Sequence, residues 1–586
     1  MTAASLASLV PLPVAIPLAG AAVAPLAARL YRPALTVVSV LALLASAAVL
    51  VVIAPTVYGG HVLVEYLGKW GPVNGQVLGV TFGVDAWGLT FALVAASIGA
   101  VLLIFMVSDQ ATLGRREAGA SACLFLLLDA ALIGGALTAD LFNLFVWFEV
   151  AALASYALTA FFLERPPALE AAFKVLVLTN VASFLIFIAT ALLYTRHGAL
   201  NLGQLHDALV GHTDSADLIA LGLLIAGFAT KAGLVPFHGW LPDAHTVAPG
   251  PISALFSGLM VNFGIATIGR IVFSLYPGTG AQVLGLLMVL GLVSAVGGAI
   301  FALLQDDLKR LLAYDTISQM GVLAIGLATA SPTGLAGTAY HLVNHALFKS
   351  LLFLCAGAIV HATGATNLSN MHGLARRMPW LVGAFTVGAA AIAGIPPLNG
   401  YVSLGLIHQA LERGHQTVPY VLTLLAQAIT VAALGKAVLA FFRRQRNPYA
   451  RDERLRPGMR AALLLIAGAC LTLGVAPEWV LNNLIEPASA ALSDAPAYTH
   501  AVLSGGGQVD PHRISYHYLN PLELALLPAT VVLAAPLIWL ARRYRDSQAI
   551  RRVRSVQTGS VNDYASYLVV GLLVTVASTA LVPLVR

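Results

Sequence analysis

The sequence predicts an all-α polytopic membrane protein with about sixteen transmembrane helices, and three observations support this fold class. First, 59% of the 586 residues are hydrophobic, only 10% are charged, and the mean hydropathy is +0.85. Second, apolar runs of about 20 residues, the length that crosses a bilayer as a helix, recur along the whole chain. Third, Lys and Arg gather in alternate connections between these runs, as they do in multi-pass membrane proteins.

The apolar runs define the spans in order along the chain. The predicted spans are 8–28, 34–54, 79–108, 119–138, 141–163, 169–195, 217–241, 250–275, 281–304, 310–330, 334–360, 380–411, 416–442, 461–481, 523–541 and 562–585. The longest of them must tilt, break or continue outside the lipid.

The charge distribution predicts the orientation of the chain. Of the 32 Lys and Arg residues, 22 fall in connections on one side, above all in the basic loops 443–460 and 542–554, against six on the other. The positive-inside rule places those loops in the cytoplasm and both termini outside, in a cytoplasmic membrane. Because the charges are spread over seven loops instead of one folded face, nucleic acid is not expected as a partner.

The sequence lacks the motifs of soluble enzymes. The three cysteines, at 123, 355 and 470, lie far apart within spans, and no CxxC, zinc spacing or disulfide framework is present. No dinucleotide fingerprint, P-loop, nucleophile elbow or EF-hand loop occurs either. We therefore expect no cofactor, no resident metal and no catalytic activity of the chain's own.

Lys231 lies in the middle of the apolar stretch 221–242 (LGLLIAGFATKAGLVPFHGWLP). A lysine at bilayer depth costs at least ~2.5–3.5 kcal/mol on insertion scales, so packing alone rarely explains one. The glycines and prolines directly after it break the helix, which is tolerated only where the freed backbone faces protein or water. A cation beside a broken helix indicates an ion pathway.

A second segment repeats this pattern. KAGLVPFHGW (231–240) and IAGIPPLNGY (392–401) share Ala, Gly, Pro and Gly at matching positions. The segments lie five spans apart, so the second copy crosses the membrane in the opposite direction, as in the inverted repeats of transporters. Four parts follow. They are a three-helix segment (1–110), a first five-helix repeat (111–278), a second inverted repeat (279–445), and C-terminal helices (446–586) with an external loop (482–522).

Glu149 is the predicted partner of Lys231. It lies in the fifth span, in the apolar run DLFNLFVWFEV (140–150). A lone carboxylate in such a setting takes up a proton, whereas beside a cation it stays charged, so a changing distance between the two shifts its protonation. That behaviour suits a proton relay. A static ion pair that locks two helices is the alternative.

His341, His345 and Lys349 fall at i, i+4 and i+8 of the eleventh span, one stripe on a single helical face. Histidine titrates near neutral pH and both donates and accepts protons, so the stripe favours proton carriage. Packed, hydrogen-bonded histidines are one alternative. Metal or haem binding is another, although no further ligand at a suitable spacing stands out.

Four other polar residues within spans are candidates for the same pathway: Lys174, His408, Lys436 and Asp129. Lys174 opens the sixth span and Lys436 lies near the cytoplasmic end of the thirteenth, so either could extend to the interface instead. Asp129, in the middle of the fourth span, could pair with a lysine or cap a polar cluster.

At these residues the chain resembles the antiporter-like subunits shared by respiratory complex I, energy-converting hydrogenases and multisubunit Mrp-type cation/proton antiporters. The segments that carry the resemblance are TADLFNLFVWFEVAALASYAL (138–158), KAGLVPFHGWLPDAHTVAPGPISALFSGLM (231–260), DLKRLLAYDTISQMG (307–321), YHLVNHALFKSLLFLCAGAIVH (340–361) and GIPPLNGYVS (394–403). The first segment looks closest to the D subunit of the Mrp antiporters.

The resemblance implies a fourteen-helix core of two inverted five-helix bundles, each with a broken helix, followed by extra C-terminal helices. It also implies a Glu–Lys pair, here Glu149 and Lys231, and a chain of buried polar groups that carries protons at mid-membrane. His345 and Lys349 match proton-carrying positions of the family.

The chain departs from the family pattern at two positions. Asn262 stands where a lysine is usual, and Leu404 where a lysine or glutamate is usual. Neither side chain carries a net proton. Either water and His408 bridge these gaps, or the subunit does not complete a proton path.

These observations predict a proton-translocating subunit of a multisubunit Na⁺ or K⁺/proton antiporter, with other membrane subunits as partners. One alternative is the proton-pumping module of a redox complex, such as a hydrogenase or a quinone oxidoreductase. A non-conducting structural homologue is a second alternative, favoured by Asn262 and Leu404.

Overall fold

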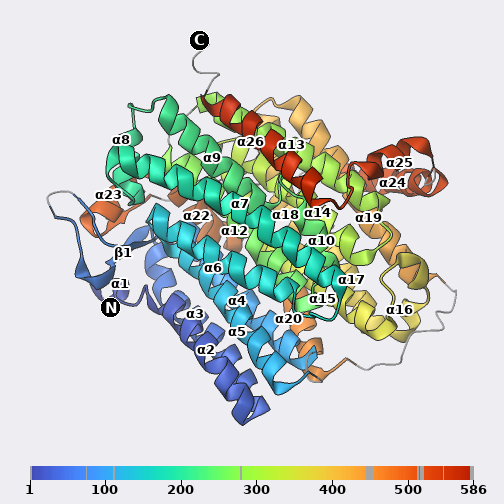
Figure 1. Ribbon diagram of the computed structural model, residues 1–586. Helices are drawn as coiled ribbons and strands as arrows, with labels where there is room; N and C mark the ends of the chain where they lie inside the picture. Colours follow the sequence, from blue (N-terminus) through green and yellow to red (C-terminus); the bar gives the residue numbers. More distant parts are fainter. Residues whose placement is uncertain are drawn as a thin grey trace.

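A computed structural model of the chain describes residues 3–73, 76–109, 113–276, 280–443, 455–510, 514, 516, 521–544 and 547–580. Within these residues, fifteen helices are long and apolar enough to cross a membrane. A further crossing is made in two pieces, α17 (Pro379–Ile392) and α18 (Asn399–Arg413). The predicted all-α polytopic fold is confirmed (Figure 1). A helix satisfies its backbone hydrogen bonds within the segment itself, as the interior of a bilayer requires.

The helices before and within the first repeat follow the predicted spans closely. They are α1 (Ala3–Ala7), α2 (Leu12–Leu30), α3 (Arg32–Tyr58), α4 (Ala86–Asp109), α5 (Arg115–Leu137), α6 (Leu141–Thr159), α7 (Pro166–His197), α8 (Leu202–Leu209), α9 (Ser215–Ala232), α10 (Trp240–Val247), α11 (Gly250–Leu255) and α12 (Val261–Arg270). Two π-helical turns, Phe256–Met260 and Ile271–Leu275, continue the last of these spans.

The second repeat and the C-terminal part are built in the same way. Besides α17 and α18 they hold α13 (Gly280–Leu304), α14 (Leu308–Ala328), α15 (Pro332–Thr363), α16 (Leu374–Arg377), α19 (Thr417–Phe442), α20 (Pro457–Val475), α21 (Pro477–Val480), α22 (Glu486–Ser493), α23 (Ala495–Ser504), α24 (Pro521–Arg543), α25 (Gln548–Ser555) and α26 (Val561–Ala580). Short turns of other helix types lie at Leu67–Lys69, Leu368–Asn370 and Leu481–Ile485.

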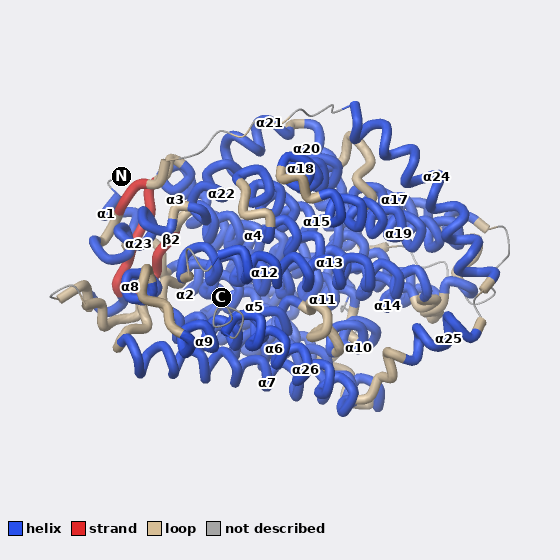
Figure 2. Tube along the Cα trace, turned by 90° about the horizontal axis from the view of Figure 1, so that it is seen from above, coloured by secondary structure: helices blue, strands red, loops and turns tan. Residues whose placement is uncertain are grey.

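A small antiparallel sheet covers one end of the helices (Figure 2). Its strands are β1 (His61–Tyr66), β2 (Thr81–Val84) and β3 (Gly507–Gln508), in the order β2-β1-β3. Because β2 occupies the start of the predicted span 79–108, that helix begins only at residue 86.

The segment 482–522, predicted as a loop, is largely helical where it is described, which corrects that prediction. It contains α22 and α23. Helix α22 is buried against α4 and α15, and Arg270 of α12 stacks on the ring of Tyr498 in α23 at 4.4 Å. Small, apolar residues let these helices pack onto the bundle. Parts of this segment (511–513, 515, 517–520) and of the basic loop 443–460 (444–454) lie outside the described residues.

The second membrane helix of each repeat begins with the same structure. Asp140 caps the start of α6 and lies in a β-bridge with Asn201, and Asp307 caps α14 and bridges to Asn367. The stretches around these asparagines read GALNLG and GATNLS, at 198–203 and 364–369. This match is a second correspondence between the repeats, in addition to the Gly/Pro match.

Each repeat also contains the predicted broken helix. Helix α9 ends at Gly233 (φ +72°) and α17 gives way at Gly394 (φ +74°), a backbone conformation that favours glycine. A cis X–Pro bond follows in both, at Val235–Pro236 and Pro396–Pro397.

The backbone groups freed at the breaks find partners on other helices. The N–H of Val235 donates to Ser294 Oγ of α13 at 2.9 Å. The side-chain amide of Gln427 in α19 donates to the carbonyl of Ala393 at 3.1 Å. Each break therefore has a freed backbone group hydrogen-bonded to another helix, as a broken membrane helix requires.

Candidate functional site

Lys231 lies on the last turn of α9, directly before the break, and is fully buried. Its ammonium donates to Ser183 Oγ of α7 at 2.8 Å. This bond leaves the lysine with a neutral partner. The break fixes where the lysine stands, because helix α9 cannot continue past Gly233.

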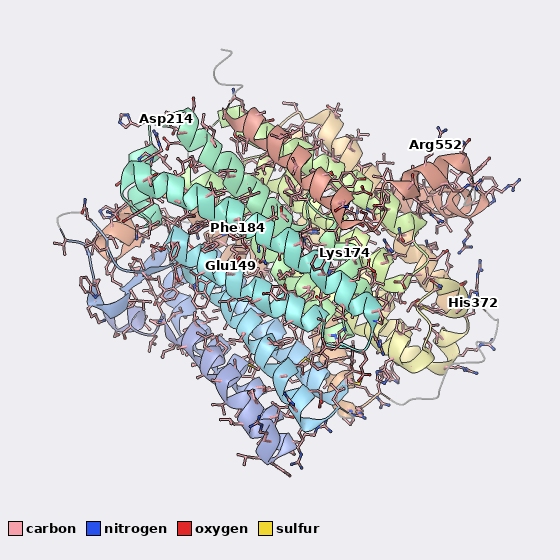
Figure 3. The ribbon with its side chains drawn as sticks, viewed as in Figure 1. Glu149, Lys174, Phe184, Asp214, His372 and Arg552 are labelled. Carbon is pink, nitrogen blue, oxygen red and sulfur yellow. The ribbon has the colours of Figure 1, made fainter. Side chains whose placement is uncertain are left out.

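Glu149 lies on the neighbouring helix α6 and is half-buried (Figure 3). One of its oxygens, Oε1, is buried without a hydrogen-bond partner among the described residues. Glu149 and Lys231 lie near enough to interact electrostatically. Within the described chain, however, they form no ion pair at 4.0 Å or less. The structure thus brings the predicted pair near without contact.

Lys174 lies near the start of α7, and its side chain is only 6% exposed. It pairs with Asp243 of α10 at 2.9 Å and with Glu170 at 2.7 Å. Asp243 also faces Arg310 of α14 at 3.7 Å. This charged cluster ties α7, α10 and α14 together, and sequence reasoning did not identify Asp243 as its centre.

The second repeat holds a contact ion pair that sequence reasoning missed. Lys349 of α15 lies 2.5 Å from Asp315 Oδ2 of α14, and both side chains are fully buried. The ammonium also donates to the carbonyl of Leu312 at 3.0 Å. The available signal was an aspartate inside an apolar span, the same kind of signal that identified Glu149.

The two histidines on α15 differ in their surroundings. His341 contacts Ser403 Oγ at 2.9 Å and Gln319 Oε1 at 3.0 Å, so both ring nitrogens have partners. His345 is fully buried, and neither of its nitrogens has one in the described structure. The ring centroids lie 6.4 Å apart, so a proton passing between them needs an intervening carrier such as water.

Asn262 and Leu404 mark the two departures from the family pattern. The amide of Asn262 donates to the carbonyls of Gly258 at 2.8 Å and Leu342 at 3.0 Å, which joins α12 to α15. Leu404 and His408 line a cavity of about 20 Å³ together with Tyr401 and Gln427. Such a cavity has room for a water molecule beside polar groups.

Asp129 and Lys436 take part in none of the contacts described above. Asp129 packs against Gly99 of α4, where an added Cβ would come within 2.7 Å of its Oδ2, and neither carboxylate oxygen has a partner among the described residues. The structure does not pair it with a lysine. Lys436 donates to the carbonyls of Leu303, at 2.6 Å, and Gln305 at the end of α13. A cation is favourable at that helix end, where the dipole is negative.

His245 joins the two repeats, and sequence reasoning missed it as well. It lies on α10, and its ring stacks on Phe353 of α15 at 4.6 Å. Both ring nitrogens are buried, without a partner in the described structure, and the ring interacts electrostatically with Lys349 and Lys309. In the sequence His245 falls between the predicted spans 217–241 and 250–275, so nothing in the pattern marked it as buried.

The inverted five-helix repeats, with buried lysines on α9 and α15, define a polytopic membrane protein of the ion-transporter type of architecture. The chain belongs to the family described as NADH:quinone oxidoreductase/Mrp antiporter, transmembrane, whose pattern matches residues 138–430. The resemblance read from the sequence is therefore confirmed.

Similar proteins are subunits of larger membrane complexes. The chain is 33% identical over 495 residues to the NADH-quinone oxidoreductase N subunit of Desulforudis audaxviator (strain MP104C), covering 81% of this chain and 97% of the relative. It is 31% identical over 473 residues to the Na(+)/H(+) antiporter D subunit of Alkalihalophilus pseudofirmus, covering 80% and 94%. A chain in the structure of the Mrp complex from Dietzia sp. DQ12-45-1b superposes with a TM-score of 0.78 at 26% identity, covering 86% and 100%.

Proposed function

We propose that this chain is the proton-translocating subunit of a multisubunit Na⁺ or K⁺/proton antiporter of the cytoplasmic membrane. One observation carries the proposal. Lys231 is fully buried at a helix break and donates a hydrogen bond to the neutral hydroxyl of Ser183, with the carboxylate of Glu149 near but not in contact. A buried cation with a neutral partner is poised to release and regain a proton.

The exchange depends on the distance between Glu149 and Lys231. When Glu149 approaches, its charge stabilises the protonated lysine, and when it withdraws, the buried lysine releases its proton. The half-buried position of Glu149 leaves it free to alternate between these distances.

The proton continues through buried polar groups that cross from one repeat to the other. His245 lies between α10 and α15, and Lys349, His345 and His341 follow along α15. Water completes the steps between groups that do not touch. The cavity beside Leu404 supports this arrangement, since it has room for a water next to His408.

The partners are other membrane subunits, as the two relatives, an N subunit and a D subunit of multisubunit complexes, suggest. The basic loops face the cytoplasm and both termini face outside. The described residues make an even number of crossings, which is consistent with termini on one side.

The test is reconstitution of the purified complex into proteoliposomes that carry a pH gradient. Addition of Na⁺ or K⁺ should dissipate the gradient, and Lys231→Ala in the same complex should abolish this response. Absence of cation-dependent dissipation in the wild-type complex would contradict the proposal.

A second candidate is the proton-pumping module of a redox complex. The 33% identity to the NADH-quinone oxidoreductase N subunit favours it. The same residues would carry protons, but the driving reaction would lie in other subunits. Co-purification with iron–sulfur subunits would select this candidate, whereas their absence from an active complex would select the antiporter.

The non-conducting homologue remains a third candidate because of Asn262 and Leu404. Asn262 uses its amide to hold α12 against α15, a structural task. Loss of cation-dependent proton movement in Lys231→Ala, in a complex that still contains this chain in normal amount, would argue against it.

A further inference from the structure

A cavity of about 250 Å³ opens where α13, α19, α24 and α25 come together. Four cationic side chains line it: Lys436, Arg443, Arg542 and Arg554. His372 is also in its wall, and Asp306 is the acidic residue among the described lining residues. The cavity far exceeds the ~30 Å³ that one water occupies in the liquid, so it has room for a polar headgroup.

The positive charge in this cavity is only partly balanced. Arg443 and Arg542 interact as like charges. Arg554 donates to the carbonyl of Leu304 at 2.7 Å, a neutral acceptor. Within the described chain, none of these three arginines lies within 4.0 Å of a carboxylate. Guanidinium groups gathered in this way favour a phosphate-bearing anion, which they bind by paired hydrogen bonds.

The cavity lies at the edge of the membrane region. Helices α13, α19 and α24 are transmembrane candidates, and α25 carries Arg551 and Arg552 beside them. Helix α24 stands at the periphery of the bundle and exposes Val532 (70%) and Trp539 (58%) (Figure 1). Figure 3 shows His372 and Arg552 at the same end of the molecule. An anion bound here would have an apolar helix face directly beside it.

We propose that this cavity binds the phosphodiester headgroup of an anionic phospholipid, with the acyl chains along the exposed face of α24. Arg443 and Arg542 hold the phosphate from α19 and α24, and the bound headgroup relieves their mutual repulsion. The lipid thereby fastens α24 to α19. Basic cavities between membrane helices on the cytoplasmic side are suited to such headgroups.

The test uses the full-length chain in a nonionic detergent, with thermal stability as the readout. The probes are dioctanoyl-phosphatidylglycerol, the zwitterionic dioctanoyl-phosphatidylcholine and inorganic phosphate. Arg443→Gln/Arg542→Gln removes two cavity charges. Arg551→Gln/Arg552→Gln is the matched control, because it removes the same charge from α25 at positions that do not line the cavity.

Phosphatidylglycerol should raise the melting temperature in a saturable way, and the apparent affinity should fall about 30-fold in Arg443→Gln/Arg542→Gln. If the double variant does not fold, the single variants should each lose about fivefold. The control should bind as the wild type does. Equal binding of phosphatidylcholine, equal affinity for inorganic phosphate, or unchanged binding by the cavity variants would each overturn the proposal.

Discussion

The two inverted repeats have the same arrangement of helices, but Lys231 and Lys349 lie on helices that do not correspond. Helices α7 and α15 begin at Pro166 and Pro332 and are both 32 residues long. Ser183 and Lys349 stand at matching positions along them. In the first repeat the lysine is on the broken helix, as Lys231, and meets α7 at Ser183. In the second repeat the lysine is Lys349, and it lies on α15, the helix that corresponds to α7.

The consequence is that the two lysines have different partners. Lys349 is in contact with a buried carboxylate, Asp315, at 2.5 Å. Lys231 has a hydroxyl, and its carboxylate is half-buried and apart. Removing one member of a buried contact pair leaves the other charge uncompensated and lowers stability. Replacing a buried lysine that has no contacting carboxylate removes the cost of burying its charge. We therefore expect substitutions in the first repeat to affect transport, and substitutions at the pair in the second to affect stability.

The largest effect is expected at Lys231. Lys231→Ala, and likewise Glu149→Ala, should abolish cation/proton exchange in proteoliposomes while the complex still assembles, because alanine is cheaper than lysine to bury. Lys69→Ala is the control, since Lys69 is 81% exposed beside Glu65. Near-normal exchange by either variant would refute the coupled pair.

The next effect is on stability and concerns Asp315. Asp315→Asn should lower the free energy of unfolding by about 3–5 kcal/mol, because Lys349 is then buried without its counter-charge. Replacing both members, with Lys349→Met added, should recover most of the loss. Glu149→Gln should change stability by less than about 1 kcal/mol. Denaturation in detergent measures the free energy of unfolding of all three variants. Equal losses of stability for Asp315→Asn and Glu149→Gln would contradict the proposed difference between the repeats.

His345 tests whether the second repeat conducts at all. His345→Ala should slow exchange on the order of 100-fold, the contribution typical of a positioned proton carrier. His361→Ala, on the same helix but 54% exposed, should leave exchange unchanged. If His345→Ala and Lys349→Ala both leave exchange unaltered, any path is confined to the half that holds Glu149 and Lys231.

A smaller effect is expected at Ser183. Ser183→Ala removes the hydrogen bond to Lys231. A bond to a charged group is worth at least ~1.5 kcal/mol, so exchange should slow about tenfold. Ser183→Thr keeps a hydroxyl and should restore most of the rate. An alanine variant as fast as the wild type would show that Lys231 does not need this partner.

The smallest effect is expected from probes of orientation, which should leave transport intact. Ser504→Cys, at the exposed end of α23, should react with a membrane-impermeant thiol reagent on intact cells. Arg456→Cys, directly before α20 in the basic loop, should react only after the membrane is opened. The reverse pattern would overturn the topology drawn from the positive-inside rule.

The sequence by itself determined the spans, the repeat and several of the polar residues. Apolar length predicts a membrane helix, and the cost of an ammonium in lipid singles out Lys231 whatever surrounds it. The broken helices followed from the Gly and Pro residues at 233–239 and 394–400, because these residues interrupt a helix locally. These properties depend on residue type and on near neighbours in the chain.

Only the tertiary structure decided which groups meet. Ser183 reaches Lys231, Asp315 reaches Lys349, and His245 reaches α15, although each partner comes from another helix. The hydrophobic pattern could not reveal the contact of Asp315 with Lys349, because the candidate span at α14 is buried on every side. A helix without a polar face carries no periodicity that fixes its rotation, so the packing of the whole bundle sets which side chains face one another.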